Sequence, residues 1–465
     1  MSVTGGRRMA AGQAGYALAA VLILLFAMGI IGLAFLGLAG GETRMSQVDM
    51  MSQRAFWLAE GGKERAMRRM TNLIRPPIAD TLIFANVAGP TRAPGEYGGS
   101  YTVDCLMDST TMYQATKRFM LDCVGNYRGV ERRIRQRIQM ESFAQYAYFT
   151  DDETLPNGDP IWFITGDMIE GMVHSNGTIR INGNPRFLGP VTSHANSMVG
   201  YSSYVVTGLS GWPVGGNNPS FEWIPTPEHP YALQLGIPTI PLPTQTSDLK
   251  GDAQAGGLYL PNASDIELGR DSAGVATPGW LRYRNSPAGS WADTRISGIG
   301  NRILYCNNDV HLSGILDGEL TIGSHQNIYI VDDVLYQGSS ATGTPQAGCN
   351  DLLGLVAESN VIYADNTANR TDLRVDAVMM ALNTSITAEN YNTGSLRGTL
   401  TVWGGLIQKL RGPVGTSSGG AIQTGYRKDY HYDSRVTAWT PPGFPLTGQY
   451  QEVAWTETWD ATNPF

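Results

Sequence analysis

The chain has 465 residues, of which 16% are charged and 42% are hydrophobic, and it contains 56 Gly and 25 Pro. The low charge and the abundant Gly and Pro exclude a coiled coil, and the hydrophobic and aromatic content excludes a disordered chain. With 4 Cys and no strict glycine period, it is neither a small disulfide-rich scaffold nor a collagen. A large, turn-rich globular protein remains.

The formal net charge of −8 is unevenly distributed along the chain. Residues 1–141 carry 17 Lys and Arg against 11 Asp and Glu, whereas residues 142–465 carry 16 against 30. An acidic body lacks the clustered cations that displace counterions from nucleic acid. We therefore expect no nucleic-acid partner.

The first strong pattern is an uncharged apolar run over residues 16–41. As a helix it extends over about 39 Å, which is enough to cross a hydrocarbon core and is too long for an ordinary signal peptide. Arg7 and Arg8 precede the run and Glu42 follows it, so the positive-inside rule predicts a single-pass transmembrane helix with a cytoplasmic N-terminus. A buried core helix is the alternative interpretation.

The helix is expected to continue beyond the membrane. Residues 42–75 lack Pro and carry apolar residues at helical spacing, which predicts an amphipathic extension that packs on a domain. The Gly61-Gly62 pair weakens the helix locally and suggests a bend. Pro76-Pro77 ends the helix.

Two stretches of this helix resemble a known family. GQAGYALAAVLILL (12–25) and AFWLAEGGKERA (55–66) are similar to the N-terminal region of PilX-type minor pilins of type IV pili and of the minor pseudopilin of type II secretion systems. The resemblance implies a leader over residues 1–15, which a prepilin peptidase removes after Gly15 to leave Tyr16 at the new N-terminus. It also implies a bacterial inner-membrane location and other pilins or pseudopilins as partners.

Two positions depart from the pattern of major pilins. Tyr16 occupies the first mature position, where major pilins carry Phe. Ala20 occupies the fifth mature position, where major pilins carry a Glu that pairs with a neighbour's N-terminal amine. The chain is therefore expected to be a minor subunit and not a self-polymerising one. A plain membrane anchor that is never processed is the alternative.

Residues 76–148 are expected to form a β-hairpin and a pilin-like region. The segments 101–107 and 118–124 flank a polar turn, and an Arg-rich strand follows over 128–140. The arginines suggest contact with anionic lipid or a partner pilin, or simply a solvated strand face.

The four cysteines suggest disulfides on the oxidising, exported side of the membrane. The pairs Cys105–Cys123 and Cys306–Cys349 need the least chain reach. Four buried thiols are the alternative.

The remaining chain is read as β structure in an α+β, mainly β protein. Residues 149–300 form a β and loop-rich region, and short strands recur at 6–10-residue spacing in residues 301–465. This spacing favours an irregular β-solenoid, with a β-sandwich or jelly roll as the alternative. The blocks at 166–193 and 352–365 resemble the exported domain of uncharacterised bacterial pilus-assembly-like proteins, which implies architecture and not activity.

Acidic and aromatic side chains are the candidates for binding or catalysis. Asp151, Asp152 and Asp159 lie in one loop and offer oxygen ligands for Ca²⁺, although their spacing is not that of an EF-hand. Asp332-Asp333 offers paired carboxylates of the kind that glycoside hydrolysis uses. C-terminal aromatic residues such as Tyr426 and Tyr430 are suited to stacking on sugars or to strand packing. We expect no catalytic site and no cofactor, with Ca²⁺ as the open case.

These observations predict a minor pilin- or pseudopilin-like protein that displays a large β domain outside the inner membrane, in an assembly, tip or adhesion role. Neighbouring helices would pack against its small residues Gly29, Gly32, Gly37 and Gly40. A surface glycan or host ligand is a potential partner of the β domain. The alternative is a membrane-anchored β-solenoid that binds or cleaves polysaccharide.

Overall fold

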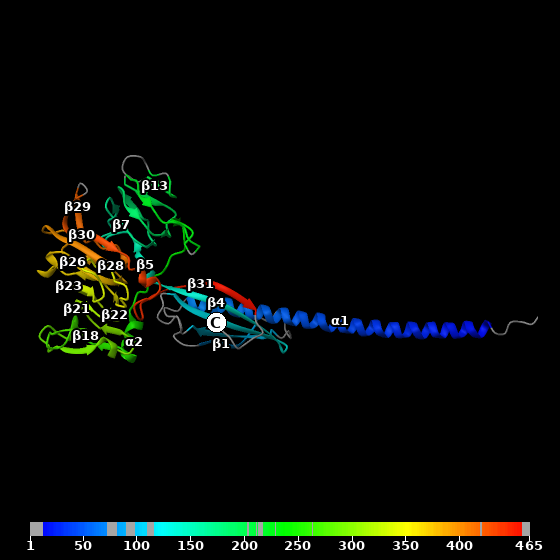
Figure 1. Cartoon of the computed structure of the whole chain (residues 1–465). Helices are drawn as coiled ribbons and strands as arrows, with labels where there is room; N and C mark the ends of the chain where they lie inside the picture. The colour runs from blue at the N-terminus through cyan, green and yellow to red at the C-terminus, as the bar shows by residue number, and fades with distance from the viewer. Residues whose placement is uncertain are drawn as a thin grey trace, which may run out of the picture.

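The computed structural model describes residues 13–71, 81–89, 98–108, 116–201, 204–210, 212, 217–227, 229–262, 264–418 and 421–457. A long N-terminal helix, a small antiparallel sheet and a large body of short strands follow one another in space (Figure 1). The sheet packs on the second half of the helix, and the first half projects away from both β parts.

Helix α1 (Gln13–Thr71) is continuous over 59 residues and therefore about 88 Å long. It contains no Pro, and it runs through Gly61-Gly62, where the sequence suggested a bend. Every residue from 18 to 50 is exposed. Among the described residues, this is one helix long and apolar enough to cross a membrane, with a mean hydropathy of 2.8 over a window of which 0% is buried.

A five-stranded antiparallel sheet covers the second half of α1, with strand order β1-β2-β3-β4-β31. Its strands are β1 (Thr81–Ala88), β2 (Ser100–Met107), β3 (Thr116–Tyr127), β4 (Val130–Ser142) and β31 (Leu446–Glu457). Strands β2 and β3 pair in register from Ser100↔Asn126 to Met107↔Phe119. The last strand of the chain thus completes the sheet that the first strands begin.

The large body is an insertion between two neighbouring strands of this sheet. Ser142 at the end of β4 pairs with Leu446 at the start of β31. The Phe143 N–H donates to the Pro445 carbonyl oxygen over 3.1 Å, and the Ser142 hydroxyl donates to the same oxygen over 3.2 Å. The chain therefore leaves the sheet and returns to it at one point.

The body is built around one wall of parallel strands. In spatial order they are β16 (Leu258–Leu260), β20 (Ile303–Cys306), β22 (Glu319–Ser324), β24 (Leu352–Ala357), β26 (Leu373–Ala381), β28 (Leu396–Leu410), β5 (Tyr146–Asp152), β8 (Met172–Ser175), β11 (Val191–Ser193) and β15 (Leu233–Leu235). The chain thus enters the wall in its middle, at β5. It winds outward to β15, crosses to β16 at the opposite end, and winds back until β28 meets β5.

The crossing segment lies along the outside of this wall. The side chain of Asn176 accepts from the backbone N–H of Ile240 and donates to its carbonyl oxygen, over 2.9 and 2.7 Å. Further along, Asn383 donates to the Thr244 carbonyl oxygen over 2.9 Å. Helix α2 (Ser247–Gly256) then buries Leu249 and Ala253 at the far end.

Further short strands complete the coils around the core. One set pairs in parallel as β17 (Ser264–Arg270), β21 (Val310–Leu316), β23 (Ile328–Tyr336), β25 (Val361–Tyr363) and β27 (Ile386–Ala388). The first half of the body adds β7 (Met168–Ile169), β10 (Arg186–Phe187) and β14 (Ser220–Phe221), and β6 (Phe163–Ile164), β9 (Arg180–Asn182), β12 (Met198–Gly200) and β13 (Tyr204–Val206). The remaining strands form hairpins: β18 (Ala276–Arg284), β19 (Ala292–Arg295), β29 (Gly415–Ser418) and β30 (Ala421–His431). The described residues also form four short helices: η2 (Phe143–Gln145), η3 (Ile296–Gly298), η4 (Ala368–Arg370) and η5 (Ser434–Thr437).

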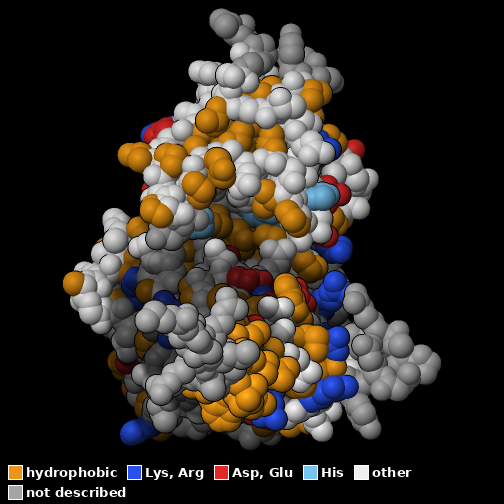
Figure 2. Space-filling view, turned by 90° about the vertical axis from the view of Figure 1, so that its right-hand side faces the viewer, with side chains coloured by type: hydrophobic (Ala, Val, Ile, Leu, Met, Phe, Trp, Pro, Cys, Tyr) orange, Lys and Arg blue, Asp and Glu red, His pale blue; other side chains and the backbone are white. Residues whose placement is uncertain are grey.

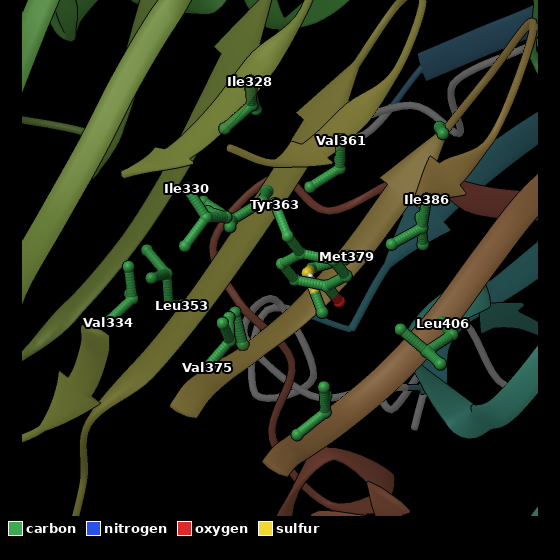
Figure 3. Close-up of a cluster of buried hydrophobic side chains, with 14 of the residues drawn as sticks. Ile328, Ile330, Val334, Leu353, Val361, Tyr363, Val375, Met379, Ile386 and Leu406 are labelled. Atoms are coloured by element: carbon green, nitrogen blue, oxygen red, sulfur yellow. Dashed lines mark hydrogen bonds between the residues drawn. The ribbon is translucent and has the colours of Figure 1, made fainter. Parts of the chain in front are cut away.

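Apolar side chains from successive coils stack inside the body. Figure 3 shows Ile330, Leu353, Tyr363, Met379 and Leu406 pointing into one cluster from five different strands. Burial of each such side chain stabilises the fold by about 1.5–3 kcal/mol, which explains why these strands read as short apolar runs.

The architecture agrees with the predicted α+β, mainly β class. Parallel pairing along the wall is the arrangement of a solenoid and not of an antiparallel sandwich. The expected division at residue 300 does not appear, because β18 to β20 belong to the same stack of coils. The C-terminal strand β31 also lies outside the body to which residues 301–465 were assigned.

The predicted disulfides are not formed, since all four cysteines are thiols in the structure. Cys123 lies opposite Val103, so it is diagonal to Cys105, and diagonal strand neighbours are about 7–8 Å apart, beyond disulfide reach. Cys306 is buried in β20, whereas Cys349 lies in a loop where its thiol donates to Asp351 over 3.5 Å.

The insertion geometry predicts that the body can be removed without unfolding the sheet. Replacing residues 144–444 by Asn-Gly joins β4 to β31 through a short hairpin turn of a favoured type. In detergent, this variant should keep an antiparallel β signal in far-UV circular dichroism and melt cooperatively. Aggregation or loss of the cooperative transition would contradict the independence of the two modules.

Candidate functional site

The first candidate site is the seam where α1 meets the sheet. Ala55, Ala59, Ala66 and Met70 are fully buried and recur on one face of the helix. Gly125 on β3 lies so close that an added Cβ would sit 2.0 Å from the Ala55 carbonyl oxygen. The small residues of the AFWLAEGGKERA segment therefore allow the helix backbone to touch the sheet directly.

Arginines on the helix fasten the seam from its sides. Arg65 donates to the Tyr101 hydroxyl over 2.9 Å, and Arg69 donates to the Ile83 carbonyl oxygen over 3.0 Å. Both guanidinium groups also lie over the ring of Phe84, at 5.2 and 5.5 Å from its centroid. In Figure 2, which faces the α1 side, Lys and Arg side chains gather around the lower part of the molecule.

The last strand of the chain also contacts the helix. The indole N–H of Trp455 donates to Glu60 over 2.7 Å, and Glu60 pairs with Lys63 at 2.9 Å. Burial alone would lower the pKa of Lys63, but hydrogen bonds and charge from Glu60 and Glu64 raise it. Strand β31 therefore joins the sheet, the helix and the inserted body.

Three arginines of the Arg-rich strand β4 have partners within the protein. Arg132 contacts Ser52 on the helix and Glu457 at the end of β31. Arg133 and Arg135 both face Asp122 on β3, at 3.4 and 3.7 Å. Arg132 therefore belongs to the seam, whereas Arg133 and Arg135 pair with Asp122 on the opposite face of the sheet.

The exposed half of α1 carries the glycines predicted for helix packing. A Cβ added at Gly29, Gly32, Gly37 or Gly40 would meet no atom within 4 Å. Gly15 and Tyr16 lie on the first turn of α1, whereas residues 1–12 of the predicted leader are outside the described residues. The structure leaves this half of the helix open to a partner.

The second candidate site is a cavity of about 340 Å³ in the body. It lies where β28 meets β5, between the loops before β6 and β7 and the β29–β30 hairpin. Its lining includes Tyr148, Trp162, Asp167, Arg411 and Lys428. These residues are far apart in the chain, and Tyr426 and Tyr430 are the two lining residues that the sequence suits to stacking on sugars.

A buried ionic network forms the inner side of this cavity. Arg411 is 5% exposed and donates to Glu153 over 3.1 Å, and it lies 3.8 Å from Asp167. Its guanidinium group also stacks 4.0 Å from the centroid of Phe163. Lys428 contacts the other oxygen of Asp167 at 3.2 Å. The network holds the β28 end, the β6–β7 turn and β30 together.

The acidic residues predicted to bind Ca²⁺ do not converge. Asp151 accepts from Asn176 over 2.8 Å and faces Lys409 at 3.4 Å, and Asp159 accepts from Asn157 over 2.7 Å. Asp152 lies at the end of β5. Over the part of the chain that the structure describes, no group of three Asp, Glu, His or Cys is placed to hold a metal ion.

Asp332 and Asp333 lie outside the cavity. Asp333 accepts from the Arg374 backbone N–H over 2.8 Å, and burial raises its pKa. The cavity is instead lined by Asp167 and Asp429, of which Asp167 is already paired with cations.

The family model described as "Domain of unknown function (DUF4900)" matches residues 100–195, about a fifth of the chain, from β2 in the sheet to β11 in the body. No curated protein sequence matches the chain. The crystal structure of the competence-associated pilin ComZ from Thermus thermophilus is similar at 13% identity and a TM-score of 0.29, covering 88% of this chain and 97% of that one.

The two adjacent glycines of α1 give a matched test of the seam. A Cβ at Gly62 would lie 2.7 Å from the Tyr101 ring, whereas a Cβ at Gly61 meets nothing within 4 Å. Gly61→Ala should therefore raise the free energy of unfolding by about 1 kcal/mol through helix propensity. Gly62→Ala should lower it by about 1–2 kcal/mol, because crowding outweighs the same gain. Thermal melts of both variants in detergent measure the difference, and melting points that shift in the same direction would contradict the seam.

His174 in β8 predicts a pH-dependent stability. It is 0% exposed, its ring nitrogens bond Thr192 and Asn176 at 2.9 Å, and burial lowers its pKa to about 4. The unfolded chain binds a proton near pH 6.5, so stability should fall by up to about 3 kcal/mol as pH drops from 6.5 to 4. His174→Gln should flatten this part of the curve of melting temperature against pH. Equal slopes for the two proteins would show that His174 is not responsible.

Proposed function

We propose that the chain is a minor pilin- or pseudopilin-like subunit of a type IV pilus or type II secretion-type filament, which displays its inserted β body outside the bacterial inner membrane. The observation that carries the proposal is the exposure of α1 from residue 18 to 50, next to a second half that is docked on an antiparallel sheet. A filament subunit requires an exposed apolar helix for packing against other subunits and a globular part that is held rigidly to that helix.

The exposed half cannot remain in water. Its large apolar side chains, such as Leu22, Phe26 and Phe35, are 58%, 73% and 67% exposed. Covering each one with lipid or protein is favourable by about 1.5–3 kcal/mol. The helix is therefore expected to lie in the membrane before assembly and among neighbouring helices afterwards.

Two features suit this half to other helices. Gly29, Gly32, Gly37 and Gly40 leave room for a neighbouring backbone to approach, which favours close packing in an apolar medium. Ala20 supplies no carboxylate, so insertion does not require a charge partner. These features support other pilins or pseudopilins as partners and a minor rather than a self-polymerising role.

The seam gives the display its rigidity. Because Ala55 and Ala59 contact β3 directly, a force or displacement on the helix is transmitted to the sheet without a flexible linker. The β body leaves the sheet through two adjacent strands, next to the Phe143–Pro445 hydrogen bond. The body is therefore held at a fixed place beyond the helix, where it can act by binding.

Leader removal tests the proposal. Gly15→Leu should block cleavage by a prepilin peptidase, so that the protein keeps its leader and migrates as the longer form. Gly12→Leu, a matched change inside the leader, should still be cleaved, and N-terminal sequencing should then find Tyr16. Coexpression with a prepilin peptidase in a heterologous host, followed by immunoblotting, measures both. Equal processing of the Gly15 and Gly12 variants would sink the assignment.

A further inference from the structure

The cavity at the β28–β5 junction has the dimensions of a small-ligand site. Its volume of about 340 Å³ falls within the usual range for such pockets, which is about 300–1,000 Å³. It lies in the body, and its elements β5, β7, β28, β29 and β30 are remote from the free half of α1 (Figure 1). A ligand bound there would not compete with the helix partners.

The charges around the cavity are balanced and mutually paired. The four charged lining residues are Asp167, Arg411, Lys428 and Asp429. Lys428 and Arg411 both contact Asp167, and Asp429 faces His431 at 2.9 Å. An ionic ligand would therefore gain little net attraction from the cavity. A neutral ligand that both donates and accepts hydrogen bonds can accept from the cationic side chains and donate to the carboxylates.

The cavity also offers hydrogen-bonding groups that the protein leaves unused. The buried hydroxyl of Tyr148 has no hydrogen-bond partner among the described residues. Gln408 uses its side-chain oxygen to accept from the Ile386 and Gly412 backbone N–H groups at 2.9 and 3.0 Å, so its Nε2 donor remains for a ligand. Unmet buried polar groups beside a cavity indicate water or a polar ligand.

Aromatic rings supply the remaining lining. Trp162 and Tyr430 are half-buried at the cavity, and Tyr426 lines it from β30. Flat aromatic faces beside planar polar side chains match a sugar ring, which has an apolar C–H face and a rim of hydroxyl groups.

We propose that this cavity binds one or two residues of a neutral saccharide. Trp162 would lie against the ring, Lys428 and Gln408 would donate to its hydroxyl groups, and Asp167 would accept from them. This inference goes beyond the filament role and does not depend on it, because it concerns the body alone.

Saturation-transfer NMR on the full chain tests the binding. The detergent should be zwitterionic, since maltoside and glucoside headgroups are themselves sugars. The probes are glucose, galactose, mannose and N-acetylglucosamine, together with the disaccharides cellobiose, lactose and chitobiose. At least one probe should bind saturably, with a Kd on the order of 1 mM or tighter.

Paired variants locate the site. Trp162→Ala should weaken binding at least about tenfold, whereas Trp439→Ala, at a tryptophan that is 41% exposed and lies outside the cavity, should leave it unchanged. Lys428→Gln, which removes a charge at the opening, should also weaken binding. It replaces Trp162→Ala as the test variant if circular dichroism shows that Trp162→Ala does not fold. No saturable binding by any saccharide, tighter binding of inorganic phosphate or glucuronate, or equal loss in the Trp439 variant would each overturn the proposal. Leader cleavage is a separate readout, so the two proposals can fail independently.

Discussion

The pairing of β4 with β31 is the interaction on which the rest of the structure depends. It brings Ser142 beside Leu446 and so joins Ser142 to Pro445, which is 303 positions further along the chain. The same strand carries Trp455 and Glu457 to the helix and to Arg132. Without this pairing the sheet loses one edge, the seam loses several of its polar contacts, and the body hangs from one strand instead of two.

A second long-range pairing plays the same part inside the body. Strand β28 reaches β5 only after the chain has crossed the outside of the wall and wound back, and the Arg411–Glu153 pair at that junction joins residues 258 apart. The cavity exists because two halves of the stack meet there. The junction is the place in the body where loops from both halves face each other, so a site at this position can be altered without rebuilding the coils.

Sequence patterns predicted the elements that depend on residues close together in the chain. The uncharged run and the helical spacing of Ala55, Ala59 and Ala66 predicted α1, and the β2–β3 hairpin follows from its turn. Strand β31 was wrongly assigned to the β body, because nothing in the sequence LTGQYQEVAWTE indicates that it pairs with a strand about three hundred residues earlier. The Cys105–Cys123 disulfide failed because a two-residue difference in register decides whether these two thiols can meet. The cavity was missed because parallel stacking, and not sequence spacing, brings Tyr148, Asp167 and Arg411 together.

The position of β31 after the whole body also sets the order in which the molecule can be completed. Contacts between distant segments form late, because loop closure must precede them. As the polypeptide emerges, α1 and β1 to β4 are available long before residues 446–457, so β4 waits with an unpaired edge while the whole body is made. A chain that lacks residues 446–457 leaves this sheet with four strands, whatever the state of its coils. The sheet is therefore completed only after the whole body has been synthesised, although its other four strands precede the body in the chain.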